Sequence, residues 1–186
     1  MSFNNTTDEQ IAAQVVRIPE MFGFLIDRYE DKLDRYIERK TGLAKDQRVD
    51  ILQDVFIRTY QNIASFDTRM SFNSWIYRIC HNTLINDWKR NKRYREGISI
   101  NEESAIILQQ MVSESTIETE IDAILLQEKM KRAIDQLSDS YKTVITLFYL
   151  EHLSYEEISV VLELPIGTVG TRLNRARKKL LSLLEN

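Results

Sequence analysis

The sequence predicts an all-α protein with two small helical domains joined by an acidic linker. Glycine and proline number only five and two among 186 residues, whereas strand-rich folds need a turn residue every ~8–12 positions. Apolar residues recur at spacings of three and four along most of the chain, which is the period of an amphipathic helix. The apolar runs are far shorter than the ~18 residues of a membrane span, so we expect no direct membrane insertion.

Four helices are expected in the first domain, which we place at residues 5–95. Thr7 and Gln10 form a potential capping box, which predicts the start of a short first helix. Pro19 suits the first turn of a second helix, and Gly42 suits the position beyond its end. The four apolar stripes comprise Ile11 and Val15, then Phe22, Leu25, Ile26, Tyr29, Leu33, Tyr36 and Ile37, then Val49, Leu52, Val55, Phe56, Tyr60 and Ile63, then Phe72, Trp75, Ile76, Ile79, Thr83, Leu84 and Trp88.

The linker is expected at residues 96–116 and the second domain at residues 117–186. Helical periodicity is weak between Gly97 and Ser115, where Ser, Asn and Gln are frequent. The helical pattern resumes with Ile117, and a new helix is expected to start at Ser138. No internal repeat or low-complexity tract interrupts this organisation.

The charged residues of the chain are arranged in blocks that its net charge of −3 conceals. Residues 86–95 carry five basic side chains, and residues 164–184 carry five more without an acidic one. Between them, residues 96–128 hold eight acidic side chains and neither Lys nor Arg. Clustered basic residues are typical of nucleic-acid binding, although a charge block is often only a solvated face.

Several classes of function are excluded by missing residues. One cysteine and two histidines cannot supply a structural zinc site, and the glycine-rich phosphate loops and the nucleophile elbow are missing. We therefore expect no catalytic residues, no metal, no cofactor and no small-molecule substrate. The single cysteine cannot form an internal disulfide, and the N-terminus lacks the pattern of a signal peptide, so a cytoplasmic protein is expected.

The C-terminal segment predicts a helix-turn-helix. Ser154 and Glu157 form a capping box, Pro165 ends the helix that follows, and Gly167 is expected to relieve the tight corner. The last helix should bury Val169, Leu173, Ala176 and Leu180 and present Thr168, Thr171, Arg172, Asn174, Arg175 and Lys178. Arginine can bind guanine and asparagine can bind adenine through paired hydrogen bonds. The alternative is an amphipathic terminal helix with a solvated basic face.

Aromatic residues crowd the segment that leads into the first basic block. They are Phe66, Phe72, Trp75, Tyr77, Trp88 and Tyr94. Cations and flat rings together suit melted DNA, because the cations bind phosphates and the rings stack on unpaired bases. Phe72, Trp75 and Trp88 also fit the apolar stripe, so a purely structural role is equally open. For Cys80 and His81 we expect burial or a surface position and no reactive role.

Three motifs resemble segments of the extracytoplasmic-function (ECF) group of bacterial sigma factors. The stretches that begin Leu153-Ser-Tyr-Glu-Glu and Leu164-Pro-Ile-Gly-Thr-Val are similar to the helix-turn-helix that reads promoters. Asp50-Ile-Leu-Gln-Asp-Val-Phe56 is similar to the segment that binds the clamp helices of RNA polymerase. Phe72-Asn-Ser-Trp-Ile-Tyr-Arg-Ile, Asn82 and Asp87-Trp-Lys-Arg90 are similar to the segment that melts the −10 element.

The resemblance implies a sigma factor that binds core RNA polymerase and promoter DNA and has no chemistry of its own. It also implies an anti-sigma partner. It assigns polymerase binding to Asp50, Gln53, Asp54 and Phe56. It assigns −10 binding and melting to Trp75, Arg78, Asn82, Asp87, Lys89, Arg90 and Arg93. It assigns −35 binding to Thr168, Thr171, Arg172, Asn174, Arg175 and Lys178.

Two positions depart from the family pattern, and two rival functions stay open. Gly170 stands where the family usually has a basic or polar residue, and Cys80-His81 stands where a small residue is common. One rival is a helix-turn-helix regulator that binds operators without joining the polymerase. The other is a helical enzyme, which the missing motifs disfavour. The resemblance also implies an acidic linker that occupies the polymerase's basic RNA channel, against the alternative of a simple tether.

Overall fold

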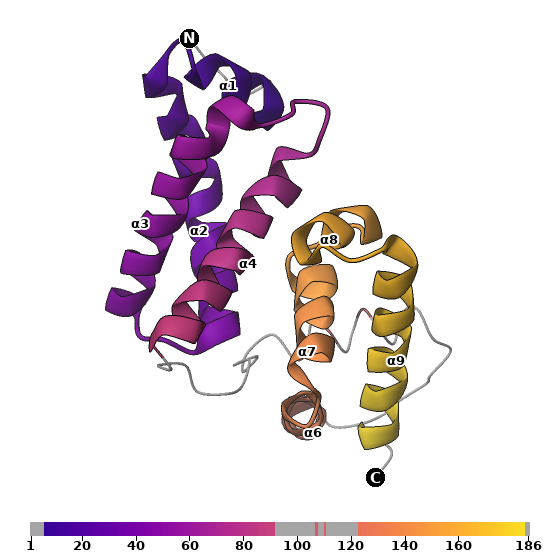
Figure 1. The fold of residues 1–186 in the computed structure, drawn as a ribbon. Coiled ribbons are helices and arrows are strands. Elements are labelled where there is room, and N and C mark those ends of the chain that lie inside the picture. The colour runs from indigo at the N-terminus through magenta and orange to yellow at the C-terminus, as the bar shows by residue number, and fades with distance from the viewer. Residues whose placement is uncertain (1–5, 92–106, 108–109, 111–122, 185–186) are drawn as a thin grey trace. The chain divides into compact units, whose positions relative to one another are not determined.

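The structure is a computed structural model that describes residues 6–91, 107, 110 and 123–184. Within this part of the chain every regular element is a helix (Figure 1). The chain divides into two compact units, one built mainly from residues before Arg95 and one mainly from residues after it. The predicted all-α, two-domain fold is confirmed, and each unit is described by itself.

The first unit contains four α-helices and two 3-10 turns. These are α1 (Asp8–Val15), η1 (Pro19–Met21), α2 (Phe22–Thr41), α3 (Lys45–Asn62), η2 (Ile63–Ser65) and α4 (Phe72–Asn91). The predicted capping box is present, since Thr7 Oγ1 accepts from the Gln10 amide and Gln10 Oε1 accepts from the Thr7 amide. Pro19 opens the turn that leads into α2. Gly42 adopts a φ of 63°, as expected for a glycine beyond a helix end.

The core of the first unit is built around α2. Its stripe residues Leu25, Tyr29, Leu33, Tyr36 and Ile37 are 0–1% exposed, and burying each large apolar side chain contributes roughly 1.5–3 kcal/mol. From the other helices the core receives Ile11, Val55, Phe72, Ile76 and Cys80. Cys80 is therefore a packing residue, which agrees with one of the two placements that its sequence position allows.

The second unit contains α6 (Ala123–Asp135), α7 (Asp139–Ile145), the π-helical segment η3 (Thr146–Leu150), α8 (Tyr155–Leu162) and α9 (Ile166–Leu184). The predicted new start at Ser138 is confirmed, because Ser138 is the N-cap residue of α7. Its hydroxyl does not cap the helix but lies 3.1 Å from the Ser140 hydroxyl. Helices α8 and α9 form the predicted helix-turn-helix.

The turn between α8 and α9 has its left-handed residue at a different position from the predicted one. The capping box at the start of α8 is confirmed, with Glu157 N to Ser154 Oγ at 3.1 Å and Ser154 N to Glu157 Oε2 at 3.0 Å. The left-handed residue of the corner is Glu163, with a φ of 52°. The expectation that Gly167 relieves the corner was wrong, because α9 has already begun at Ile166 and Gly167 is one of its helical residues.

Candidate polymerase and promoter interfaces

Helix α9 has one fully buried face and one exposed polar face. Val169, Leu173, Ala176 and Leu180 are each 0% exposed, as predicted. The six residues predicted to bind −35 DNA share the opposite face: Thr168, Thr171, Asn174, Arg175 and Lys178 are exposed and Arg172 is half-buried. Since the buried face fixes the rotation of the helix, these six side chains are presented together.

Arg177 is a basic residue of α9 that packs inward instead of joining the polar face. Its Nε donates a hydrogen bond to the Tyr149 hydroxyl at 2.6 Å. Its guanidinium also lies 5.3 Å from the ring centre of Phe148 and 5.4 Å from that of Tyr149. Both rings come from η3, so Arg177 holds α9 against η3. From the sequence, Arg177 was identified only as one of the five basic residues of the C-terminal block. Its packing role was missed because its partner Tyr149 lies 28 residues away in the chain.

Gly170 lies inside α9 against the ring of Tyr155. A Cβ added to it would meet Tyr155 at 3.5 Å, which is ordinary van der Waals contact. Gly170→Ala is therefore expected to raise the free energy of unfolding of the second unit by about 1 kcal/mol, because alanine loses less backbone entropy in a helix. Thermal unfolding followed by circular dichroism measures this gain, and a lowered melting temperature would contradict it.

Helix α3 presents a mixed acidic and apolar face. Asp50 and Gln53 are exposed, and Asp54 is half-exposed in an ion pair with Arg58, whose Nε lies 2.8 Å from Asp54 Oδ2. The side chain of Phe56 is only 9% exposed and packs edge-on against Phe22, with ring centres 6.3 Å apart. The ring of Phe56 is therefore a core group, which favours a packing role over the predicted polymerase contact.

Helix α3 has three exposed apolar residues that the sequence analysis did not assign to the surface. Ile57 is 54% exposed, and Val49 and Tyr60, which were expected in the core, are 39% and 45% exposed. They lie at helical spacings from Asp50 and Gln53 on the outer side of α3. Exposed apolar side chains beside charged ones are typical of a protein interface. Helical spacings of three and four run through Val49, Leu52, Phe56 and Tyr60, so periodicity held no signal that separates the exposed residues from the core.

Helix α4 places the residues predicted to bind the −10 element in different environments. Asn82 is exposed and Arg78, one turn earlier, is half-exposed. Asp87 is half-exposed and Trp88 is 49% exposed. The side chains of Lys89 and Arg90, and all of Arg93, lie outside the described residues.

The aromatic cluster before the first basic block is a core cluster. Phe72 is 0% and Trp75 is 6% exposed. Phe66 lies 5.4 Å from Phe72 and 4.9 Å from Trp75 between ring centres. The ring of Trp75 is therefore packed inside the unit, which favours its structural role over the predicted DNA contact. Of the aromatic residues that the structure describes here, Trp88 keeps its ring accessible.

The loop before α4 contains a local ion pair. Arg69 donates to Asp67 through Nε at 2.9 Å and Nη2 at 2.7 Å, and these hydrogen bonds lower the pKa of Asp67 from 3.8 to about 2. A lowered carboxyl pKa means that the interaction is present above the ordinary value and is lost as the pH falls towards 2.

An NMR titration of the Asp67 carboxyl is expected to give a midpoint near pH 2. In Arg69→Gln the midpoint should return towards the ordinary value of 3.8, because the charged donor is lost. An unchanged midpoint in that variant would show that Arg69 is not the cause.

The part of the chain that the structure describes offers neither a metal site nor a membrane span. No group of three or more His, Cys, Asp or Glu side chains there could hold a metal ion. None of the described helices is both long and apolar enough to cross a membrane.

Comparison with known proteins matches both units to one family. The family model "Sigma-70 region 2" matches residues 25–94 and "Sigma-70, region 4" matches residues 127–180. The ECF RNA polymerase sigma factor SigW of Bacillus subtilis is 34% identical over 164 residues, which cover 87% of each chain. The chain belongs to the ECF sigma factors. The ECF sigma-E factor of Haemophilus influenzae is 32% identical over 176 residues, 92% of each chain.

Solved structures show the same fold. CnrH, in a structure with the cytosolic domain of CnrY, has a TM-score of 0.66 at 24% identity over 96% of this chain and 97% of that one. The sigma factor RpoE of Bartonella quintana, in complex with the anti-sigma factor NepR, has a TM-score of 0.61 at 19% identity over 88% and 96% of the two chains.

As an ECF sigma factor, the protein binds core RNA polymerase, recognises the −35 and −10 promoter elements and promotes promoter melting. The rival interpretation as an operator-binding regulator is not favoured, because it leaves the region 2 match of the first unit unexplained. Both matching family models are regions of sigma-70.

Proposed function

We propose that this ECF sigma factor reads the −35 element with the exposed face of α9. The observation that carries the proposal is the grouping of all six predicted residues opposite a fully buried face. Asn174 and Arg175 supply the side chains that bind adenine and guanine edges. Lys178, a little over one turn beyond Asn174, supplies a point charge for a phosphate.

The first unit supplies two further surfaces in this proposal. Arg78 and Asn82 on α4, with Asp87, Trp88, Lys89, Arg90 and Arg93, bind and melt the −10 element. Asp50, Gln53 and Asp54 on α3 bind the polymerase clamp, together with the exposed Val49, Ile57 and Tyr60. Trp75 and Phe56 act from the core by holding α4 and α3 in place, which is supported by their ring contacts.

The proposal also covers the localisation, the regulation and the domain division of the protein. It acts in the cytoplasm, has no catalytic activity or cofactor of its own, and is held inactive by an anti-sigma factor. The anti-sigma partner is supported by the two related folds, which were solved with the cytosolic domain of CnrY and with the anti-sigma factor NepR. Residues 5–95 and 117–186 act as the two domains. The acidic segment 96–116 joins them, and its Ile107 has a buried side chain.

The −35 assignment is tested with holoenzyme reconstituted from core polymerase and the full-length chain. Arg175→Ala is expected to cost ~1–3 kcal/mol on the preferred promoter and to relax preference at one base position. Lys178→Ala should weaken binding to all −35 sequences alike and make binding less dependent on salt. Dissociation constants on single-base promoter variants at several salt concentrations measure both effects, and equal losses on every sequence in both variants would refute the division of roles.

A further inference from the structure

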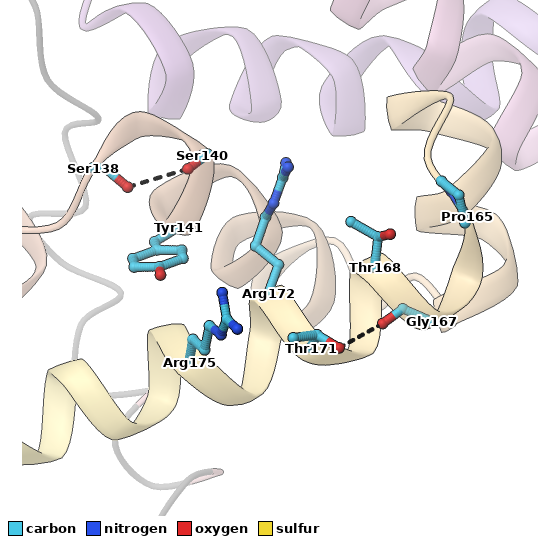
Figure 2. A pocket seen from close by; sticks show the side chains of 9 residues that line it. All are labelled: Ser138, Ser140, Tyr141, Pro165, Gly167, Thr168, Thr171, Arg172 and Arg175. Atoms are coloured by element: carbon cyan, nitrogen blue, oxygen red, sulfur yellow. Dashed lines mark hydrogen bonds between the residues drawn. The ribbon is translucent and has the colours of Figure 1, made fainter.

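A groove runs along α9 on the side that faces the corner between α6 and α7. One part is a hollow of about 680 Å³ lined by Thr168, Thr171, Arg172 and Arg175 of α9 and by Ser138, Ser140 and Tyr141 of the corner (Figure 2). A second hollow continues it towards the end of α9 and shares Ser138, Tyr141 and Arg175 with the first. The second hollow adds Lys178, Lys179, Ser182, Gln136 and Leu137.

The lining of this groove has the chemistry of an anion site. It contains four cationic side chains, Arg172, Arg175, Lys178 and Lys179, and no carboxylate. The hydroxyls of Ser138 and Ser140 lie 3.1 Å apart on the opposite side. The Ser138 hydroxyl makes no capping bond to α7, so it can rotate to donate to a bound oxygen.

Arg172 differs in position from the residues that read bases. It is half-buried, whereas Asn174 and Arg175 are exposed. In Figure 2 its side chain extends from α9 into the space between Ser140 and Thr168. Arg172 lines the same hollow as the Ser138 and Ser140 hydroxyls. A guanidinium and hydroxyl groups in one hollow suit a phosphate, whose oxygens accept charge-assisted hydrogen bonds.

We propose that this groove seats a backbone phosphate of the promoter strand that passes beside α9, held by Arg172 and by the Ser138 and Ser140 hydroxyls. The proposal rests on the −35 function of α9 and extends its footprint to the α6–α7 corner. Phosphate contacts of this kind fix the register of a protein on duplex DNA without reading sequence. Arg172 therefore sets the register from which Asn174 and Arg175 reach the bases.

An acidic polypeptide is the other ligand whose chemistry the cations would accept. The DNA strand is favoured because Thr168, Thr171 and Arg175 line the hollow and also belong to the proposed base-reading face. A duplex that docks on this face must bring one of its strands to the groove.

The test uses holoenzyme with the full-length chain and promoter fragments that carry one neutral methylphosphonate at a time across the −35 region. With the parent protein, one or two adjacent substitutions are expected to weaken binding about tenfold, because a hydrogen bond to a charged group is lost. Ser138→Ala combined with Ser140→Ala, and separately Arg172→Gln, should weaken binding to unmodified DNA by a similar factor. At the same phosphate, these variants should show no further loss. Lys131→Gln, an exposed cation of α6 outside the groove, is the matched control and should keep the parent's profile.

The two levels of the proposal fail in distinguishable ways. If base changes in the −35 element leave binding of the parent unchanged, the proposed function of α9 fails. If base changes matter but the serine variant and the methylphosphonate act additively at every position, the groove proposal alone is overturned. It is likewise overturned if the serine and Arg172 variants bind promoter DNA normally and lose only binding to polyglutamate, which would assign the groove to an acidic polypeptide.

Discussion

Asp34→Ala is expected to lower the free energy of unfolding of the first unit by about 3 kcal/mol, because it leaves a buried guanidinium without its main partner. Arg48 of α3 is 8% exposed and binds Asp34 of α2 through two parallel hydrogen bonds, Nε to Oδ1 at 2.8 Å and Nη2 to Oδ2 at 2.9 Å. The Arg48 guanidinium stays charged when Asp34 is removed, because arginine does not lose its proton in proteins.

Glu38 provides the matched control for this prediction. Its carboxylate also binds Arg48, at 2.9 Å from Nη1, but its side chain is 52% exposed. Exposed ion pairs contribute about 0–1 kcal/mol, so Glu38→Ala should have a small effect. For a unit of this size, 3 kcal/mol corresponds to a fall in melting temperature on the order of 15 °C. Equal effects of the two substitutions would show that burial of Arg48 does not decide the energy.

Asp54→Arg is expected to abolish assembly with core RNA polymerase while the first unit stays folded. Asp54 is half-exposed beside Asp50 and Gln53, and its ion pair with Arg58 is local to α3. The substitution reverses the charge in the middle of the proposed interface, and like charges brought together across an interface cost several kcal/mol. Co-elution with core polymerase should fall by at least about a hundredfold.

Asp31→Arg makes the same change of charge on the exposed side of α2 and should assemble normally. The far-ultraviolet circular dichroism of both variants should match that of the parent. Normal assembly of Asp54→Arg would remove α3 from the polymerase interface, while failure of both variants would point to net charge as the cause.

Features that depend on neighbours within one helix could be predicted from the sequence. The capping boxes at Thr7 and Ser154 and the left-handed Gly42 rest on contacts or conformations a few residues wide, and the structure confirms them. The same holds for α9, whose spacing of four, three and four predicted both its buried and its exposed face. Local geometry is enough in these cases because the helical period links sequence position directly to direction.

Packing between helices, which periodicity does not reveal, sets which residues at the edge of an apolar stripe face the core. The apolar stripe of α3 includes Val49, Phe56 and Tyr60, and the sequence alone does not show which of them are buried. Packing against α2 buries Phe56 and leaves Val49 and Tyr60 exposed. From the sequence, Trp75 is equally suited to contact DNA and to pack in the core. In the structure its ring packs against Phe66 and Phe72. Arg177 was not among the residues expected on the exposed face of α9, but only the tertiary contacts show that it packs against aromatic rings of η3. These outcomes depend on contacts between segments far apart in the chain, which helical periodicity does not encode.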